Sequence, residues 1–253
     1  MKKLISFYSY SILKFKDNRI RSFFYVLAAA LIGLIFYLPV IPNMIPAQAL
    51  TRFPMSIIMI LVVLQSIIFI ALLAAAGAYL APRVGFRAPL CDVHINQQTF
   101  RSVLKEQCLI AIPVGLAGAI IACLVAPEFI SYVNKTPPLP RLFYGGLTEE
   151  VAARWGIMTI IVWILWRIFQ KGNGTPTNIL VCSGILLSQT IFALGHIPAL
   201  NMAGVGNVSW SIVTIFFVSI LWGWLFWKRG LEAAMIAHAS FHAFIAIFTA
   251  VNR

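Results

Sequence analysis

The sequence predicts an all-α fold, a polytopic bundle of about seven transmembrane helices, and three observations support this prediction. First, 61% of the 253 residues are hydrophobic and only 10% are charged, whereas a soluble globular domain carries about 25% charged residues. Second, apolar stretches of about 20 residues recur along the chain, each long enough to cross a hydrocarbon core of about 30 Å. Third, the basic residues concentrate on alternate connecting segments, as the positive-inside rule describes.

The seven apolar segments account for most of the chain, and each ends where polar, basic or proline-containing sequence begins. The predicted spans are 22–41, 55–81, 107–127, 142–169, 178–198, 207–227 and 230–250. We therefore predict one membrane domain, residues 1–253. In it, a basic N-terminal segment (1–21) and supporting helices (22–141) precede a helical core (142–250) that carries the polar motifs.

The basic residues predict how the chain is oriented and what it contacts. With the N-terminus in the cytoplasm, 14 of the 19 Lys and Arg residues lie on the cytoplasmic side, Arg154 lies within a span, and the remaining four are Arg52, Lys135, Arg141 and Arg253. Topology therefore explains most of the net charge of +12. We expect contact with the lipid bilayer and its anionic headgroups rather than with nucleic acid. The compact, basic chain with short loops favours a prokaryotic cell membrane.

Ionisable residues inside the spans are candidate functional residues, because a charge in hydrocarbon is costly. Near the start of the fourth span, Thr148 is a plausible N-cap that would place Glu149 and Glu150 in the first helical turn. Glu150 and Arg154 are four residues apart and can pair on one face. Glu149, about 100° round the helix, is then free to point elsewhere. An interfacial cap with a salt bridge would explain the same residues without catalysis.

The four histidines divide into three within or beside the later spans and one in a loop. Phe192 and His196 lie one turn apart at the end of the fifth span, where a histidine can also be an ordinary interfacial residue. His238 and His242 share a face of the seventh span, among alanines that leave room for a cavity. We expect His94 to be an ordinary loop residue.

Two further features predict structural roles. The four cysteines form no C-x-x-C pair, and we expect small buried side chains rather than a disulfide framework or a zinc-thiolate site. Glu232 is close to Arg229 at the start of the seventh span, and we expect it to cap that helix.

Three motifs follow one another in chain order: Glu-Glu-x-x-x-Arg at 149–154, Phe-x-x-x-His at 192–196 and His-x-x-x-His at 238–242. Together they resemble the CAAX protease and bacteriocin-processing (CPBP, or Abi) family of intramembrane endopeptidases, over residues 142–246. The resemblance implies an active site between spans four, five and seven. It also implies hydrolysis of a membrane-associated peptide or protein, with or without a lipid anchor, such as a prenylated protein, a pheromone precursor or a bacteriocin leader.

The resemblance also implies a role for each motif residue. Glu149 matches the glutamate that activates water, and Glu150 with Arg154 matches a supporting pair. His196 matches the histidine that helps to hold the water, and Phe192 accompanies it in the same motif as a supporting residue. His238 matches the histidine thought to stabilise the oxyanion.

The residue at position 242 departs from the family pattern, which usually has asparagine there. Neutral histidine can donate one hydrogen bond, so His242 could still serve an oxyanion hole. The departure also keeps a metal-dependent mechanism open, since Glu149, His196, His238 and His242 together could satisfy Zn²⁺. The sequence contains no HExxH motif, and we expect the metal-free mechanism, without a cofactor.

Two other classes of protein fit the same residues. A transporter could use a buried Glu, His and Arg relay, although the sequence has no inverted repeats or paired broken helices. A non-catalytic immunity or scaffold protein could keep the fold without cleaving anything. The motifs leave open the substrate, the side from which it arrives and the oligomeric state.

Overall fold

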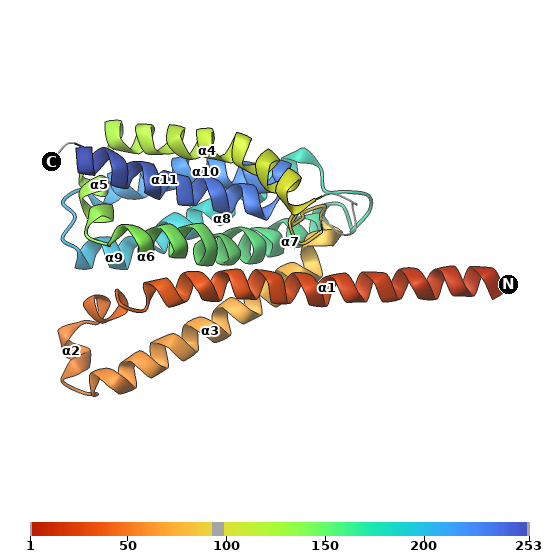
Figure 1. Ribbon diagram of the computed structural model, residues 1–253, viewed down its shortest axis with the longest axis horizontal. Coiled ribbons are helices and arrows are strands. Elements are labelled where there is room, and N and C mark those ends of the chain that lie inside the picture. The colour runs from red at the N-terminus through yellow and green to blue at the C-terminus, as the bar shows by residue number, and fades with distance from the viewer. Residues whose placement is uncertain (1, 93–98, 252–253) are drawn as a thin grey trace.

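The computed structural model describes residues 2–92 and 99–251, with side chains from residue 18 onward, and these residues form helices joined by turns. No strand occurs in these ranges, so the all-α prediction is confirmed. Figure 1 shows most of the long helices lying side by side in one bundle, while α3 diverges from α1 toward the end opposite the N-terminus. His94, predicted as a loop residue, lies outside the described residues.

The helices run from the N-terminus, which is predicted to be cytoplasmic, to the opposite end of the bundle and back. In chain order they are α1 (Lys2–Tyr37), η1 (Ile41–Met44), α2 (Ala47–Leu50), α3 (Met55–Leu80), η2 (Ala81–Arg83), α4 (Phe100–Val125), α5 (Pro127–Asn134), α6 (Pro138–Phe143), η3 (Tyr144–Glu149), η4 (Val151–Met158), α7 (Thr159–Phe169), α8 (Asn178–Leu194), α9 (Ile197–Met202), α10 (Val208–Arg229) and α11 (Leu231–Val251).

Seven stretches of the described residues are long and apolar enough to cross a membrane, as predicted. They are Asn18–Tyr37, Met55–Arg83, Phe100–Val125, Pro138–Phe169, Asn178–Met202, Val208–Arg229 and Leu231–Val251. The main differences from the prediction are earlier starts for the third and fourth stretches and a fifth that continues through α9. Polar or proline-rich residues begin or end these helices, so hydropathy alone starts the third and fourth spans too late and ends the fifth too early.

The fourth span is a continuous helical rod that runs from α6 through η3 and η4 into α7. Pro138 and Pro140 begin it, because proline fits the first turn of a helix, where backbone N–H groups need no intrahelical partner. The prediction that Thr148 caps the helix is therefore wrong. Thr148 lies well after the start of the rod, and its buried side chain donates a hydrogen bond to the carbonyl of Ala30 in α1 at 2.7 Å.

The middle of the rod, η3 and η4, is wound as π-helix. This winding is rare in proteins and occurs mostly as short bulges, frequently at functional sites. Here it includes Glu149 and Arg154, and Glu150 lies between its two segments. The altered winding changes which side chains share a face, so the direction of Glu149 could not be read from ordinary helical spacing.

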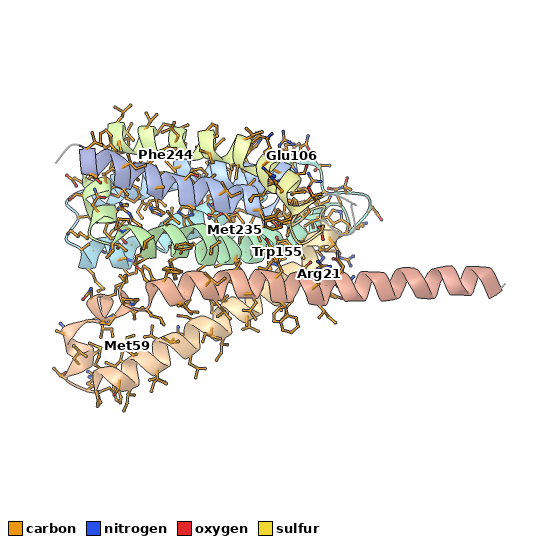
Figure 2. All side chains as sticks on the ribbon, viewed as in Figure 1. Arg21, Met59, Glu106, Trp155, Met235 and Phe244 are labelled. Atoms are coloured by element: carbon orange, nitrogen blue, oxygen red, sulfur yellow. The ribbon has the colours of Figure 1, made fainter. Side chains whose placement is uncertain are left out.

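Small residues let the supporting helices pack closely on the rod, as is common in membrane bundles. Gly33 of α1 faces Thr148, and Gly77 of α3 faces Trp155 so closely that neither glycine leaves room for a Cβ. The indole of Trp155 donates to the carbonyl of Ala74 at 3.2 Å where the rod meets α3 (Figure 2). α4 lies along α11 in the same way (Figure 1).

The structure adds a contact to the expected role of Glu232 and corrects the expected burial of the cysteines. Glu232 is buried in the first turn of α11, where it was predicted to cap the helix, and it accepts a hydrogen bond from the backbone N–H of Leu90 at 3.0 Å. It therefore also holds the segment after η2. All four cysteines are free, but only Cys91 is buried, and Cys182 is exposed on α8.

Candidate active site

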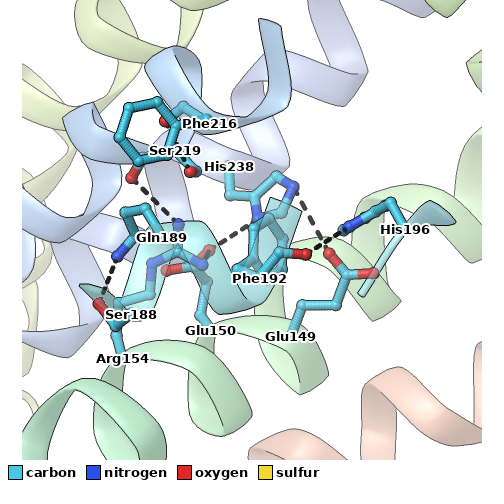
Figure 3. Close-up of polar contacts among 10 residues, drawn as sticks. All are labelled: Glu149, Glu150, Arg154, Ser188, Gln189, Phe192, His196, Phe216, Ser219 and His238. Carbon is cyan, nitrogen blue, oxygen red and sulfur yellow. Dashed lines mark hydrogen bonds and ion pairs between the residues drawn. The ribbon is translucent and has the colours of Figure 1, made fainter. Parts of the chain in front are cut away.

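The centre of the candidate site is a buried cluster of charged groups on the rod and α11. The Glu150 carboxylate is fully buried, and its Oε1 lies 3.1 Å from NH1 of Arg154 and 2.7 Å from Nδ1 of His238 (Figure 3). Arg154, also fully buried, donates from NH2 to the carbonyl of Ser219 at 3.1 Å. Glu150 therefore neutralises one buried cation and fixes the ring of His238 at the same time.

Glu149 points away from this cluster, toward the other nitrogen of His238. Its Oε2 lies 3.9 Å from Nε2 of His238, too far for a direct hydrogen bond. The Glu149 side chain is 24% exposed and that of His238 is 7% exposed. Glu149 is thus an accessible carboxylate near Nε2 of His238. Glu150 already holds Nδ1 of the same ring.

His196 is held at the end of α8 by its own helix. Its Nδ1 lies 2.8 Å from the carbonyl oxygen of Phe192. Because a carbonyl can only accept a hydrogen bond, Nδ1 carries the proton, and Nε2 of the neutral ring is left as an acceptor. The ring of Phe192 contacts the ring of His196 at 4.7 Å between centroids and lies 4.7 Å from the guanidinium carbon of Arg154.

His242 lies beside His238 on α11, with the two rings stacked at 5.0 Å between centroids. Its Nδ1 is buried and has no hydrogen-bond partner within the described part of the chain. Its Nε2 faces Gly145 of the rod, where a Cβ would lie only 2.8 Å away. Gly145 is therefore the residue that lets the rod approach both histidines.

These side chains line two cavities that share one wall. The inner cavity, of about 90 Å³, is lined by Glu149, His196, His238 and His242, so the structure brings the four predicted residues to one space. The outer cavity, of about 580 Å³, lies between α1, α3 and the rod and is mainly apolar. Both cavities are lined by Tyr37, Tyr132, Tyr144, Glu149, Phe192 and His196.

Several residues of the inner cavity gave no signal in the sequence. The Trp222 ring stacks on His238 at 5.8 Å between centroids, and the rings of Tyr37 and Tyr144 stack at 4.2 Å. Tyr37, Tyr144 and Trp222 lie in spans that each contain several other aromatic residues, so nothing marked these three. Tyr132 of α5 also lines the cavity, and burial raises its pKa to about 12, which keeps the hydroxyl protonated.

Arg141 corrects the topology prediction, which placed it in a loop. It lies in α6, within the fourth span, is only 6% exposed, and lines the inner cavity. The proline-rich sequence before it suggested a connecting segment, whereas those prolines begin the helix.

A zinc site was the alternative for the same four residues. Among the described residues, no three His, Cys, Asp or Glu side chains are grouped so that they could hold a metal ion.

Fold and site together define a polytopic helical membrane protein with a glutamate and histidine cluster enclosed between the spans. Residues 138–244 match the family described as type II CAAX prenyl endopeptidase Rce1-like. The resemblance predicted from the three motifs is thereby confirmed over this segment, which is similar to that family. Searches of curated proteins and of solved structures gave no match.

We predict that Gly145→Ala impairs the site more than the fold. The added methyl group would lie 2.8 Å from Nε2 of His242 and 3.1 Å from Nε2 of His238, so both rings must move. A displacement of catalytic groups by about 1 Å can cost about 10²-fold in rate. We therefore expect kcat/KM for the reaction catalysed at this site to fall by about 10- to 100-fold. Steady-state kinetics and a thermal unfolding curve in detergent would measure this.

The matched control for this prediction is Gly184→Ala. Its Cβ would press on Val162, between α8 and α7 and away from both cavities. We expect this variant to lose stability but to keep kcat/KM per folded molecule. Equal loss of activity in the two variants would contradict a local effect at Gly145.

Proposed function

We propose that this protein is an intramembrane endopeptidase that hydrolyses a peptide bond with water activated by Glu149. The observation that carries the proposal is the separation of 3.9 Å between Glu149 Oε2 and His238 Nε2, beside the inner cavity. Polar atoms at this separation can be bridged by one water molecule. A carboxylate that shares a water with a histidine is suited to general-base catalysis.

In the proposed reaction, Glu149 removes a proton from the water while the oxygen attacks the scissile carbonyl carbon. The acceptor Nε2 of His196 helps to hold this water, because Nδ1 is committed to the Phe192 carbonyl. The C–N bond then breaks, and the proton taken by Glu149 passes to the leaving amine. The reaction consumes one water and yields a carboxylate and an amine.

The developing oxyanion requires hydrogen-bond donors, and two histidines are available. Because Nδ1 of His242 has no acceptor in the described residues, the proton of its neutral ring is better placed on Nε2, which lies against Gly145 in the wall of the inner cavity. His238 presents its Nε2 toward Glu149, while its Nδ1 is held by the Glu150 carboxylate at 2.7 Å, so the ring is oriented toward the site of attack. The surrounding apolar helices exclude bulk water and strengthen these interactions.

The outer cavity supports a membrane-associated substrate. Its volume of about 580 Å³ and its apolar walls from α1 and α3 suit a hydrocarbon chain or an apolar peptide segment. Since it shares Glu149 and His196 with the inner cavity, a substrate anchored there would present its peptide to the catalytic groups. CAAX-type processing and maturation of a bacteriocin or pheromone precursor both provide such substrates.

We also propose a prokaryotic cell membrane with the N-terminus in the cytoplasm. Moving Arg141 into the fourth span leaves Arg52, Lys135 and Arg253 on the opposite side, which strengthens the asymmetry.

The test is cleavage of a farnesylated peptide with a C-terminal CAAX sequence by the purified protein in nanodiscs, run in ¹⁸O-labelled water. We expect one labelled oxygen in the new carboxylate and an unchanged rate after treatment with a zinc chelator. A rate lost with the chelator and restored by Zn²⁺ would support the metal-dependent alternative. Ion flux in liposomes without cleavage would indicate a transporter, and neither activity would favour an immunity or scaffold protein.

A further inference from the structure

Two arginines at one end of the bundle take no part in the proposed reaction. Arg19 lies at the start of the first span, and Arg83 is the last residue of the second. Figure 1 shows α3 meeting α1 near the end of α3 and diverging from it toward the other end. Both charges therefore lie where a hydrocarbon core of about 30 Å gives way to the lipid headgroups.

Both guanidinium groups lie against one aromatic ring. The guanidinium carbon of Arg83 lies 3.7 Å from the centroid of the Tyr79 ring, and that of Arg19 lies 4.9 Å from the same centroid. The two carbons cannot be further apart than the sum of these distances. NH1 of Arg83 also donates to the backbone carbonyl of Tyr79, four residues earlier. Tyr79 therefore holds two cations from two different spans close to each other.

Neither cation has a carboxylate to neutralise it. Among residues whose side chains are described, no Asp or Glu oxygen lies within 4.0 Å of Arg19 or Arg83. In the same part of the chain, Nε of Arg19 is buried without a hydrogen-bond partner. The face of an aromatic ring attracts each cation, but two like charges on one ring repel each other. A ligand with negative charge would remove this repulsion.

We propose that Arg19 and Arg83 bind the phosphate group of an anionic phospholipid. Phosphate fits because it combines negative charge with several oxygens, so two guanidinium groups can donate to it at once. Basic sites between spans on the cytoplasmic side of a membrane are suited to anionic headgroups. The site is separate from the inner cavity, and the proposal does not depend on the catalytic role of Glu149.

The surface beside Tyr79 favours a lipid as the source of this phosphate over a phosphate from solution. Ile68, Leu72 and Tyr79 follow one face of α3 and are 52%, 65% and 52% exposed. At 1.5 Å per residue, this stripe extends about 16 Å from the headgroup level toward the middle of the membrane. That is about half of the hydrocarbon core, the length open to an acyl chain of one leaflet.

The test measures phospholipid binding to the full-length protein by native mass spectrometry from detergent micelles. Dioleoyl phosphatidylglycerol carries a negative headgroup, and dioleoyl phosphatidylcholine has the same acyl chains on a headgroup without net charge. Charge-assisted hydrogen bonds predict that wild type binds phosphatidylglycerol about 10-fold more tightly. In the variant Arg19→Gln/Arg83→Gln, the ratio of the two dissociation constants should be close to one.

This ratio is internal to each variant, so a reduced folded fraction does not change it. The matched control is Arg101→Gln/Lys105→Gln, which removes two exposed positive charges from α4 that are not on the Tyr79 ring. It should keep the wild-type ratio. A ratio near one in wild type, a preference that survives in Arg19→Gln/Arg83→Gln, or an equal fall in the control would overturn the proposal.

Sodium phosphate distinguishes a lipid from a soluble source. Inorganic phosphate should not displace phosphatidylglycerol from wild type, because it cannot contact the apolar stripe on α3. Displacement by phosphate, together with phosphate binding that disappears in Arg19→Gln/Arg83→Gln, would overturn the lipid assignment and indicate a soluble phosphate compound.

A second readout follows from the helices that the lipid would join. α1 and α3 both line the outer cavity, and a phospholipid bound to Arg19 and Arg83 would hold these two helices together at one end. In nanodiscs, phosphatidylglycerol should therefore raise the thermal unfolding midpoint of wild type above that in phosphatidylcholine, and should do so less in Arg19→Gln/Arg83→Gln. Neither readout uses peptide cleavage, so failure of the catalytic proposal would leave both results unchanged.

Discussion

Glu149→Gln is expected to lower kcat/KM for peptide cleavage by about 10²- to 10⁴-fold, the range that a general base contributes. The amide has nearly the size of the carboxylate but cannot take a proton from water. Glu149 lies outside the ion pair between Glu150 and Arg154, so unfolding should change little. The measurements are steady-state kinetics and thermal unfolding of the same preparation.

Glu106→Gln is the matched control, because it makes the same chemical change at an exposed carboxylate in α4, outside both cavities. It should leave kcat/KM within about twofold, since surface substitutions have small effects. Cleavage by Glu149→Gln at the rate of this control would remove Glu149 from the mechanism. Glu149→Asp, which keeps the charge but shortens the side chain, should retain intermediate activity.

The pairing of Glu150 with Arg154 could be predicted from the sequence, whereas the direction of Glu149 could not, because the segment is wound as π-helix. Residues four apart share a helix face, and a buried arginine needs a counter-ion. The observed distance of 3.1 Å between the two side chains agrees with this reasoning. The same local argument correctly put His238 and His242 on one face of α11.

The second role of Glu150 could not be predicted, because it depends on a contact across 88 positions of sequence. Helical spacing relates residues within one span but gives no distance between spans. For the same reason the stacking of Trp222 on His238 and the approach of Gly145 to both histidines had no signal in the sequence. The position of Arg141 was missed for a local reason, since prolines suggested a loop where they begin a helix.

Arg154→Met is expected to destabilise the protein by about 3–5 kcal/mol, the range measured when one partner of a buried ion pair is removed. Arg154 and Glu150 are both fully buried, so the remaining carboxylate would have lost its cation in the interior of the bundle. The hydrogen bond to the Ser219 carbonyl and the contact with Phe192 would be lost as well. Unfolding curves in mixed detergent micelles would measure the change.

The control for size and charge is Arg167→Met, at an exposed position in the same rod, which should change stability by less than about 0.5 kcal/mol. The double variant Glu150→Gln/Arg154→Met should recover most of the stability, because no unpaired charge is left inside. It should not recover activity, since His238 would still lack the carboxylate that holds its Nδ1 at 2.7 Å. Recovery of both would mean that Glu150 serves only to neutralise Arg154. Recovery of stability alone would separate the structural role of the ion pair from the positioning of His238.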